Sequence, residues 1–136
     1  MPDAFVDSNV LIAAASARDA DHVTGSSIVS GIDTGKLPVG RVSEYVIAEV
    51  LTYLQVRTGH EVAVDVYERL LRGDRFHIYH ASPEVFNTAI EVFTDSGRLT
   101  FVDAAIVASM RRAGCAYLYS FDADFDGIDG ITRLDV

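Results

Sequence analysis

Two aspartates stand just after short apolar runs that predict buried strands. Asp7 follows residues 4–6, and Asp122 lies three residues beyond the run 116–119. In a parallel sheet, ligands bind beyond the carboxyl ends of the strands, which is where both carboxylates would lie. An aspartate at such a position can also simply cap the following helix, so a structural interpretation stands beside the functional one.

Two more acids lie within predicted helices. Glu49 belongs to helix 44–57, away from the centre of its apolar face, and for a lone helical glutamate a solvated position is the simpler interpretation. Asp103 follows Thr100 by three residues, a spacing that resembles a capping box. The Asp103 helix is apolar all round and should be buried, so this charge must face a polar site or a cation.

A cluster of alternating aspartates near the end of the chain has several interpretations. Asp122, Asp124 and Asp126 match the first half of an EF-hand calcium loop, but Arg133 stands where such a loop needs a bidentate glutamate. An Asp-x-Asp phosphatase nucleophile would require a nearby lysine, and the only lysine, Lys36, lies in a glycine-bounded loop. An acidic turn remains the plain alternative for Asp124 and Asp126.

Other reactive residues form no recognisable site. The four histidines and the single cysteine make no zinc pattern or catalytic triad, and there is no glycine-rich phosphate loop. Cys115 cannot form an internal disulfide, which is typical of a reducing cytosol. The longest apolar stretch, 10–15, is far shorter than the roughly 18 residues of a membrane span, and signal-peptide features are lacking. We therefore expect a soluble cytoplasmic protein without a membrane partner.

The charge balance is strongly acidic. Among the 136 residues, 20 acids oppose 11 bases, giving a net charge of −9, which should repel nucleic acid at low salt. Either the partner is not a polyanion or the protein works in concentrated salt, where the Debye length shrinks to about 3 Å at 1 M. Scarce lysine with abundant aspartate resembles proteins of salt-loving cells, so we favour a halophilic origin.

The predicted elements alternate between strands and helices along one domain, residues 1–136. Such alternation favours a three-layer α/β/α fold with a central, mainly parallel sheet, as in Rossmann-like proteins. Gly25 is expected to interrupt or weaken the second helix. The expected strands are 4–6, 39–42, 76–79, 116–119 and 131–134, and the expected helices are 10–17, 21–32, 44–57, 62–71, 83–95 and 100–113.

Taken together, these segments resemble the PIN-domain family and, within it, the VapC-type toxins. The resemblance spans essentially the whole chain and depends on four segments: residues 5–11 with Asp7, the mid-helix Glu49, residues 99–108 with Asp103, and residues 120–125 with Asp122. The segment with Asp103, an aspartate at the start of a small-residue helix, is fairly specific for this family. The other segments are weak indicators singly and strong ones in combination.

The resemblance implies the roles of the site residues. Asp7, Glu49, Asp103 and Asp122 would be the catalytic, metal-binding acids, supported by hydrogen bonds from Asn9 and Ser120. Asp124 or Asp126 could share the role of Asp122 as the fourth metal-binding acid, or take it over. Four neighbouring carboxylates need cations between them, and an all-oxygen ligand set favours Mg²⁺ or Mn²⁺ over zinc.

The expected function is metal-dependent cleavage of RNA phosphodiesters by an activated water, leaving a 5′-phosphate and a 3′-hydroxyl. The family also suggests a toxin with a cognate antitoxin and a homodimer. Alternatives are an RNA-processing PIN nuclease outside a toxin–antitoxin pair, a low-turnover RNA- or protein-binding module, and a calcium-binding domain built on the Asp122 loop. Four arginines are candidates for holding the RNA backbone: Arg41, Arg57, Arg98 and Arg112.

Overall fold

Five short parallel strands form the centre of the computed structural model, which describes residues 1–136. Their order across the sheet is β3-β2-β1-β4-β5, and all pairings are parallel, as predicted. Because β1 is central, β2 and β3 lie on one side of it and β4 and β5 on the other. The carboxyl ends of β1 and β4 therefore form a topological switch point, the position at which such sheets bind ligands. The strands are β1 (Ala4–Val6), β2 (Gly40–Ser43), β3 (Phe76–Tyr79), β4 (Tyr117–Tyr119) and β5 (Thr132–Leu134).

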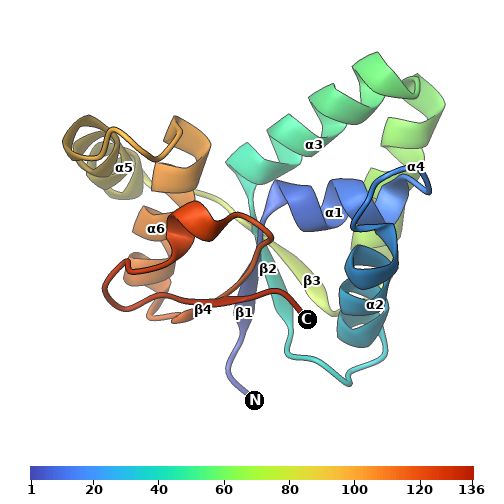
Figure 1. Ribbon diagram of the computed structural model, residues 1–136, viewed down its shortest axis with the longest axis horizontal. Helices are drawn as coiled ribbons and strands as arrows, with labels where there is room; N and C mark the ends of the chain where they lie inside the picture. Colours follow the sequence, from blue (N-terminus) through green and yellow to red (C-terminus); the bar gives the residue numbers. More distant parts are fainter.

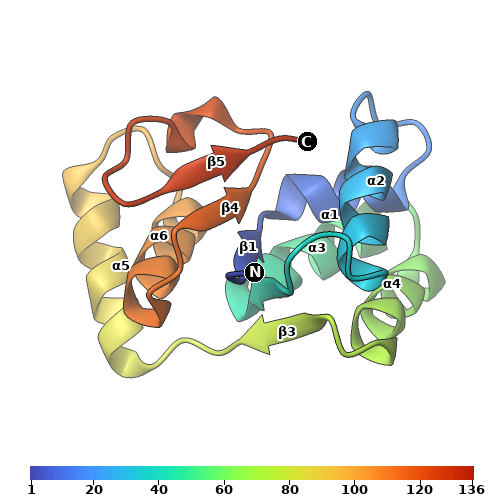
Figure 2. The ribbon, with the colours of Figure 1, turned by 90° about the horizontal axis from the view of Figure 1, so that it is seen from below.

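Helices cover both faces of this sheet, which confirms the predicted three-layer fold (Figures 1 and 2). α5 and α6 pack together on one side, whereas α1, α2 and α4 lie on the other, and α3 extends from the end of β2 before α4 returns. None of them is long and apolar enough to cross a membrane. The helices are α1 (Ser8–Ala15), α2 (His22–Asp33), α3 (Glu44–Arg57), α4 (His60–Arg72), α5 (Pro83–Asp95) and α6 (Phe101–Ala113), with a short 3₁₀ helix η1 (Ala123–Phe125).

The apolar residues of the central strands supply the core. All three residues of β1 are buried, as expected for a strand covered on both faces, and Leu118 of β4 is fully buried beside it. α6 is buried from Asp103 through Met110, because it lies against the sheet on one side and α5 on the other. Asp103 is thus a carboxylate in the first turn of a buried helix, as the sequence predicted.

Serine side chains cap the two helices that were predicted to begin at residues 44 and 83. The Ser43 hydroxyl accepts from the Tyr45 amide at the start of α3, and the Ser82 hydroxyl accepts from the Val85 amide at the start of α5. Gly114 ends α6 in the left-handed conformation at φ 67°, which glycine adopts without strain.

The expected interruption at Gly25 is wrong, because α2 is continuous through this residue. Gly25 is buried against α1, where a Cβ atom would meet the Ala13 Cβ at 2.9 Å and the Val10 carbonyl oxygen at 3.0 Å. The glycine therefore allows a close approach of the two helix backbones, and the packing compensates for its low helix propensity.

Candidate active site

Asp7 lies at the carboxyl end of β1 and is almost completely buried, at 3% exposure. Its amide donates to the Tyr119 carbonyl at 2.9 Å, which extends the β1–β4 pairing by one residue. The carboxylate then caps α1, with Oδ1 accepting from the Ser8 amide at 2.7 Å. Oδ2 accepts from the Ser120 hydroxyl at 2.7 Å. The capping role and a functional role are therefore compatible at Asp7.

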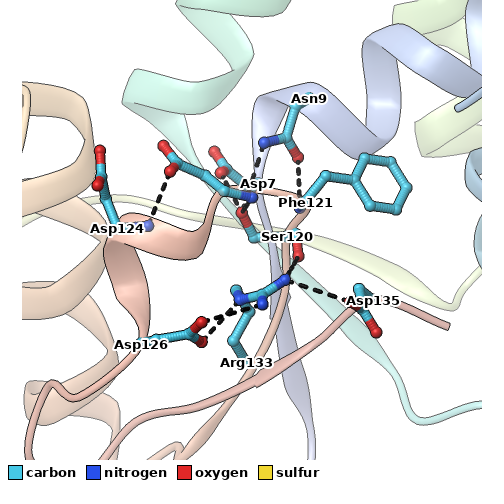
Figure 3. Close-up of polar contacts among 9 residues, drawn as sticks. Asp7, Asn9, Ser120, Phe121, Asp124, Asp126, Arg133 and Asp135 are labelled. Atoms are coloured by element: carbon cyan, nitrogen blue, oxygen red, sulfur yellow. Dashed lines mark hydrogen bonds and ion pairs between the residues drawn. The ribbon is translucent and has the colours of Figure 1, made fainter. Parts of the chain in front are cut away.

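Ser120 and Asn9 connect Asp7 to the loop after β4 (Figure 3). The fully buried Ser120 hydroxyl donates to Asp7 and accepts from the Asp122 amide at 3.0 Å. Asn9 Oδ1 accepts from the Phe121 amide at 3.2 Å, and its Nδ2 lies 3.4 Å from the Ser120 hydroxyl. Both residues thus hold the Asp122 loop against the end of β1, which is the position expected of supporting residues.

Glu49 reaches the same region from α3. Its Oε1 accepts a short hydrogen bond from the Ser8 hydroxyl, which also lies 3.4 Å from Asp7 Oδ1. Ser8 is buried, whereas Glu49 as a whole is exposed. Glu49 therefore stands at the open side of the site, with one oxygen held toward Asp7.

Asp103 forms the predicted capping box with Thr100. The Asp103 amide donates to Thr100 Oγ1 at 3.2 Å, and the Thr100 amide donates to Asp103 Oδ2 at 3.2 Å. Only one carboxylate oxygen is used in this way, and the residue is 8% exposed. The other oxygen is free for a further contact at the site.

The three aspartates of the 122–126 loop have different surroundings. Asp122 is half-buried, and its Oδ1 accepts from the Asp124 amide at 2.9 Å. Asp124 lies to one side of the Asp7–Ser120 pair in Figure 3. Asp126, considered above as a further ligand, is instead bound by Arg133 through both oxygens, at 2.8 and 3.1 Å. The structure brings Asp122 toward the other acids and turns Asp126 away from them.

The buried carboxylates have raised pKa values. Burial, opposed by the Ser120 hydrogen bond and reinforced by the charges of Asp103 and Glu49, raises the pKa of Asp7 to about 6. Burial also raises the pKa of Asp103, with contributions from the charges of Asp122 and Glu49. These mutual effects indicate that the four acids share one electrostatic environment, which a cation would stabilise.

The donor set suits a hard divalent cation, although the side chains do not already form a closed cage. No group of three or more Asp, Glu, His or Cys side chains is arranged to hold a metal ion in the present geometry. Several of the carboxylate oxygens are instead engaged by Ser8, Ser120 and the Asp124 amide. The remaining oxygens and the absence of nitrogen or sulfur donors fit Mg²⁺ or Mn²⁺ chemistry.

Two of the candidate arginines lie away from these acids. Arg41 is paired with Asp3 at 2.8 Å, before the start of β1. Arg57 stacks over the Tyr53 ring near the end of α3, 5.5 Å from its centroid. Both are engaged in contacts outside the carboxylate group.

Sequence reasoning missed two residues that organise the site. Ser8 links Asp7 to Glu49, and its place directly after Asp7 at a helix start was the available signal. Arg133 binds the carbonyl of Ser120 at 3.2 Å as well as Asp126. No local pattern predicts the Arg133 contacts, because they depend on how β5 pairs with β4.

Comparisons with known proteins agree on one family. The PIN domain model matches residues 4–131. The 23S rRNA-specific endonuclease VapC20 of Mycobacterium tuberculosis is 33% identical over 123 residues, covering 89% of this chain and 90% of the relative. The crystal structure of VapC20, described as a sarcin-ricin loop cleaving toxin, superposes with a TM-score of 0.79 at 30% identity and covers 93% of this chain and 97% of that one.

A more distant solved structure shares the fold. A chain of a toxin–antitoxin complex from Klebsiella pneumoniae has a TM-score of 0.68 at 19% identity, covering 95% of each chain. Both the family model and VapC20 span nearly the whole of the present sequence. The chain therefore belongs to the PIN-domain family, and its homologues there are VapC-type toxin endonucleases that act on RNA.

Proposed function

We propose that this chain, as one domain, is a metal-dependent endoribonuclease and the toxin of a toxin–antitoxin pair. The observation that best supports the proposal is the grouping of acids around Asp7. This buried carboxylate has a pKa of about 6 and lies within electrostatic reach of Asp103 and Glu49. Helix capping accounts for Asp7 and Asp103 separately. It does not account for several carboxylates that raise one another's pKa values in one place, whereas a cation-binding site does.

Asp7, Glu49, Asp103 and Asp122 would hold the metal. Bound Mg²⁺ or Mn²⁺ supplies Lewis acidity that activates a water and stabilises the leaving oxygen of an in-line displacement. Ser120 and Asn9 orient Asp7 and the Asp122 loop through the hydrogen bonds described above. Glu49 is exposed, and it would be the one of the four acids that holds the cation from the solvent side. The expected products carry a 5′-phosphate and a 3′-hydroxyl.

The proposed substrate is structured RNA. VapC20 is named as specific for 23S rRNA, and its structure is described as that of a sarcin-ricin loop cleaving toxin. A stem–loop of 23S rRNA is therefore the first substrate to test. With a net charge of −9, the protein should bind such a polyanion weakly at low ionic strength unless divalent cations are present.

Cleavage by an Asp103→Asn variant tests the catalytic assignment. Asparagine can still accept the Thr100 amide in the capping box, so the fold should persist while one anionic ligand is lost. We expect Mn²⁺-dependent cleavage by the wild-type protein, no cleavage by D103N, and unchanged circular dichroism. Cleavage by D103N at the wild-type rate would refute the assignment, and an inactive wild-type protein that still binds RNA would favour the binding-module alternative.

We also propose an antitoxin partner and a homodimer. A toxin–antitoxin complex shares the fold, and a cavity of about 240 Å³ between α1, α2 and α4, lined by apolar and polar side chains, offers a contact surface for a partner. A separate stripe of exposed apolar side chains lies along α5 and is a candidate surface for self-association. It consists of Phe86, Ile90 and Phe93. Sedimentation of the wild-type protein and of Ile90→Glu would test the dimer, and a monomeric wild-type protein would refute it.

A further inference from the structure

Arg133 lies on the edge strand β5, yet its side chain is only 17% exposed because it extends over the loop after β4. The guanidinium forms two hydrogen bonds to Asp126, from Nε at 2.8 Å and from Nη2 at 3.1 Å. Its Nη1 donates to the Ser120 carbonyl at 3.2 Å and lies 3.4 Å from Asp135 (Figure 3). One side chain thus makes contacts with three separate points of the chain.

Two of these contacts flank the segment that carries the fourth acid. Ser120 precedes Asp122, and Asp126 ends the 3₁₀ helix η1 that follows it. Phe125, directly before Asp126, is fully buried and also anchors the end of the segment. Arg133 therefore joins the beginning of the loop to its end, and it lies on the other side of Ser120 from Asp7 (Figure 3).

The Ser120 contact links Arg133 to the centre of the site. The Ser120 amide donates to the Leu134 carbonyl at 3.0 Å, its carbonyl accepts from Arg133, and its hydroxyl donates to Asp7. Every polar group of Ser120 is thus engaged, and two of the contacts come from β5. A displaced Ser120 backbone would move the hydroxyl that orients Asp7 and accepts from the Asp122 amide.

We propose that Arg133, together with Asp126, is a positioning residue for the metal-binding acids, holding the 120–126 loop so that Asp122 and Ser120 face Asp7. The inference rests on the proposed function, since it assigns Arg133 to the same site. Mutation of a residue that hydrogen-bonds to a metal ligand typically lowers metal affinity or activity by about 10- to 100-fold. Arg133 would act through Ser120 and the loop backbone, without touching substrate or metal.

Arginine is suited to this position by its geometry. A planar guanidinium can bind both oxygens of one carboxylate and still donate to a carbonyl, whereas a lysine ammonium cannot match this set of directions. We therefore expect Arg133→Lys to reduce loop order, Mn²⁺ affinity and kcat nearly as much as Arg133→Gln does. Asp126→Asn should have a smaller effect, because Arg133 keeps its contact with Ser120.

A second arginine provides a matched control. Arg75 also bridges a loop, donating to the carbonyls of Ile32 at 3.2 Å and Leu37 at 2.8 Å. That loop leads into the amino end of β2, whereas the acids lie at the carboxyl ends of the strands. Arg75→Gln should therefore cost a comparable amount of stability without affecting the site.

The test combines NMR relaxation with metal titration of the full chain. In R133Q, we expect backbone order parameters at Asp122 and Asp124 to fall from about 0.85 to below about 0.6. We also expect Mn²⁺ to bind at least about tenfold more weakly, and kcat on a 23S rRNA stem–loop to fall with KM unchanged. R75Q should show none of these changes.

Three results would overturn the inference or separate it from the proposed function. Unchanged order parameters in R133Q would show that Arg133 does not hold the loop. A mobile loop with unaltered Mn²⁺ affinity and kcat would show that the loop geometry is irrelevant to the site. If the wild-type protein neither binds Mn²⁺ nor cleaves RNA, the proposed function fails, and the order parameters still decide whether Arg133 holds the loop.

Discussion

The Ser120 hydroxyl donates to Asp7 Oδ2 at 2.7 Å, although the two residues are 113 positions apart in the chain. The contact follows from the register of the sheet, in which Val6 of β1 is paired with Tyr119 of β4. The next residue on each strand lies just beyond the paired edge, so a carboxylate and a hydroxyl meet at the switch point. This pair is the buried centre of the site.

Ser120→Ala should weaken metal binding and cleavage by about 10- to 100-fold. The alanine removes the donor to Asp7 and the acceptor of the Asp122 amide, so both acids lose their orientation. Ser109→Ala is the matched control, because Ser109 is equally buried but its hydroxyl has no hydrogen-bond partner. Isothermal titration with Mn²⁺ and a cleavage assay would measure both, and equal effects of the two variants would contradict the role of Ser120.

Asp7→Asn should change how the stability of the metal-free protein depends on pH. The Asp7 pKa is about 6 in the folded state against an ordinary 3.8, so the folded state binds this proton more tightly than the unfolded chain does. The free energy of unfolding should therefore fall as the pH rises from about 4 to about 6, by up to about 3 kcal/mol from this group.

D7N should lack this contribution and be more stable than the wild-type protein at pH 7.5 in EDTA. Urea unfolding at pH 4, 5, 6 and 7.5 would measure the difference, with Asp33→Asn, an exposed aspartate on α2, as the control. An identical pH dependence in D7N and the wild-type protein would show that the Asp7 carboxyl does not cause the loss of stability between pH 4 and pH 6.

Molar KCl should raise the melting temperature. The net charge of −9 implies self-repulsion in the folded state, and screening shortens its range from about 10 Å at 0.1 M to about 3 Å at 1 M salt. Differential scanning calorimetry between 0.1 and 3 M KCl would test this expectation. A melting temperature independent of KCl would count against the halophilic interpretation of the composition.

Gly25→Ala should destabilise the protein by about 1–3 kcal/mol despite the better helix propensity of alanine. The added Cβ would meet the Ala14 amide nitrogen and the Val10 carbonyl oxygen of α1, each at 3.0 Å, so the helix backbones would have to separate. Ser27→Ala, at an exposed position of α2, is the control and should be neutral or slightly stabilising. Chemical denaturation would compare them, and a stabilised G25A would contradict the packing explanation.

The sequence predicted those parts of the fold that depend on local pattern. Apolar runs such as residues 4–6 and capping residues such as Ser43 and Ser82 act over a few positions, so strands and helix starts could be located from them. Gly25 shows the limit of this reasoning. Whether a glycine weakens a helix or allows it to pack closely depends on the neighbouring helix, which local pattern does not specify.

The candidate site was likewise predicted in part from the sequence, and the rest required the tertiary structure. The sequence by itself predicted which residues would carry the chemistry, because four of its segments together resemble the PIN-domain family. Only the tertiary structure decided how Asp122 and Asp126 differ, and that Ser8 and Arg133 belong to the arrangement. These assignments depend on parallel pairing between strands far apart in the chain, and on the hydrogen bonds that such pairing brings within reach.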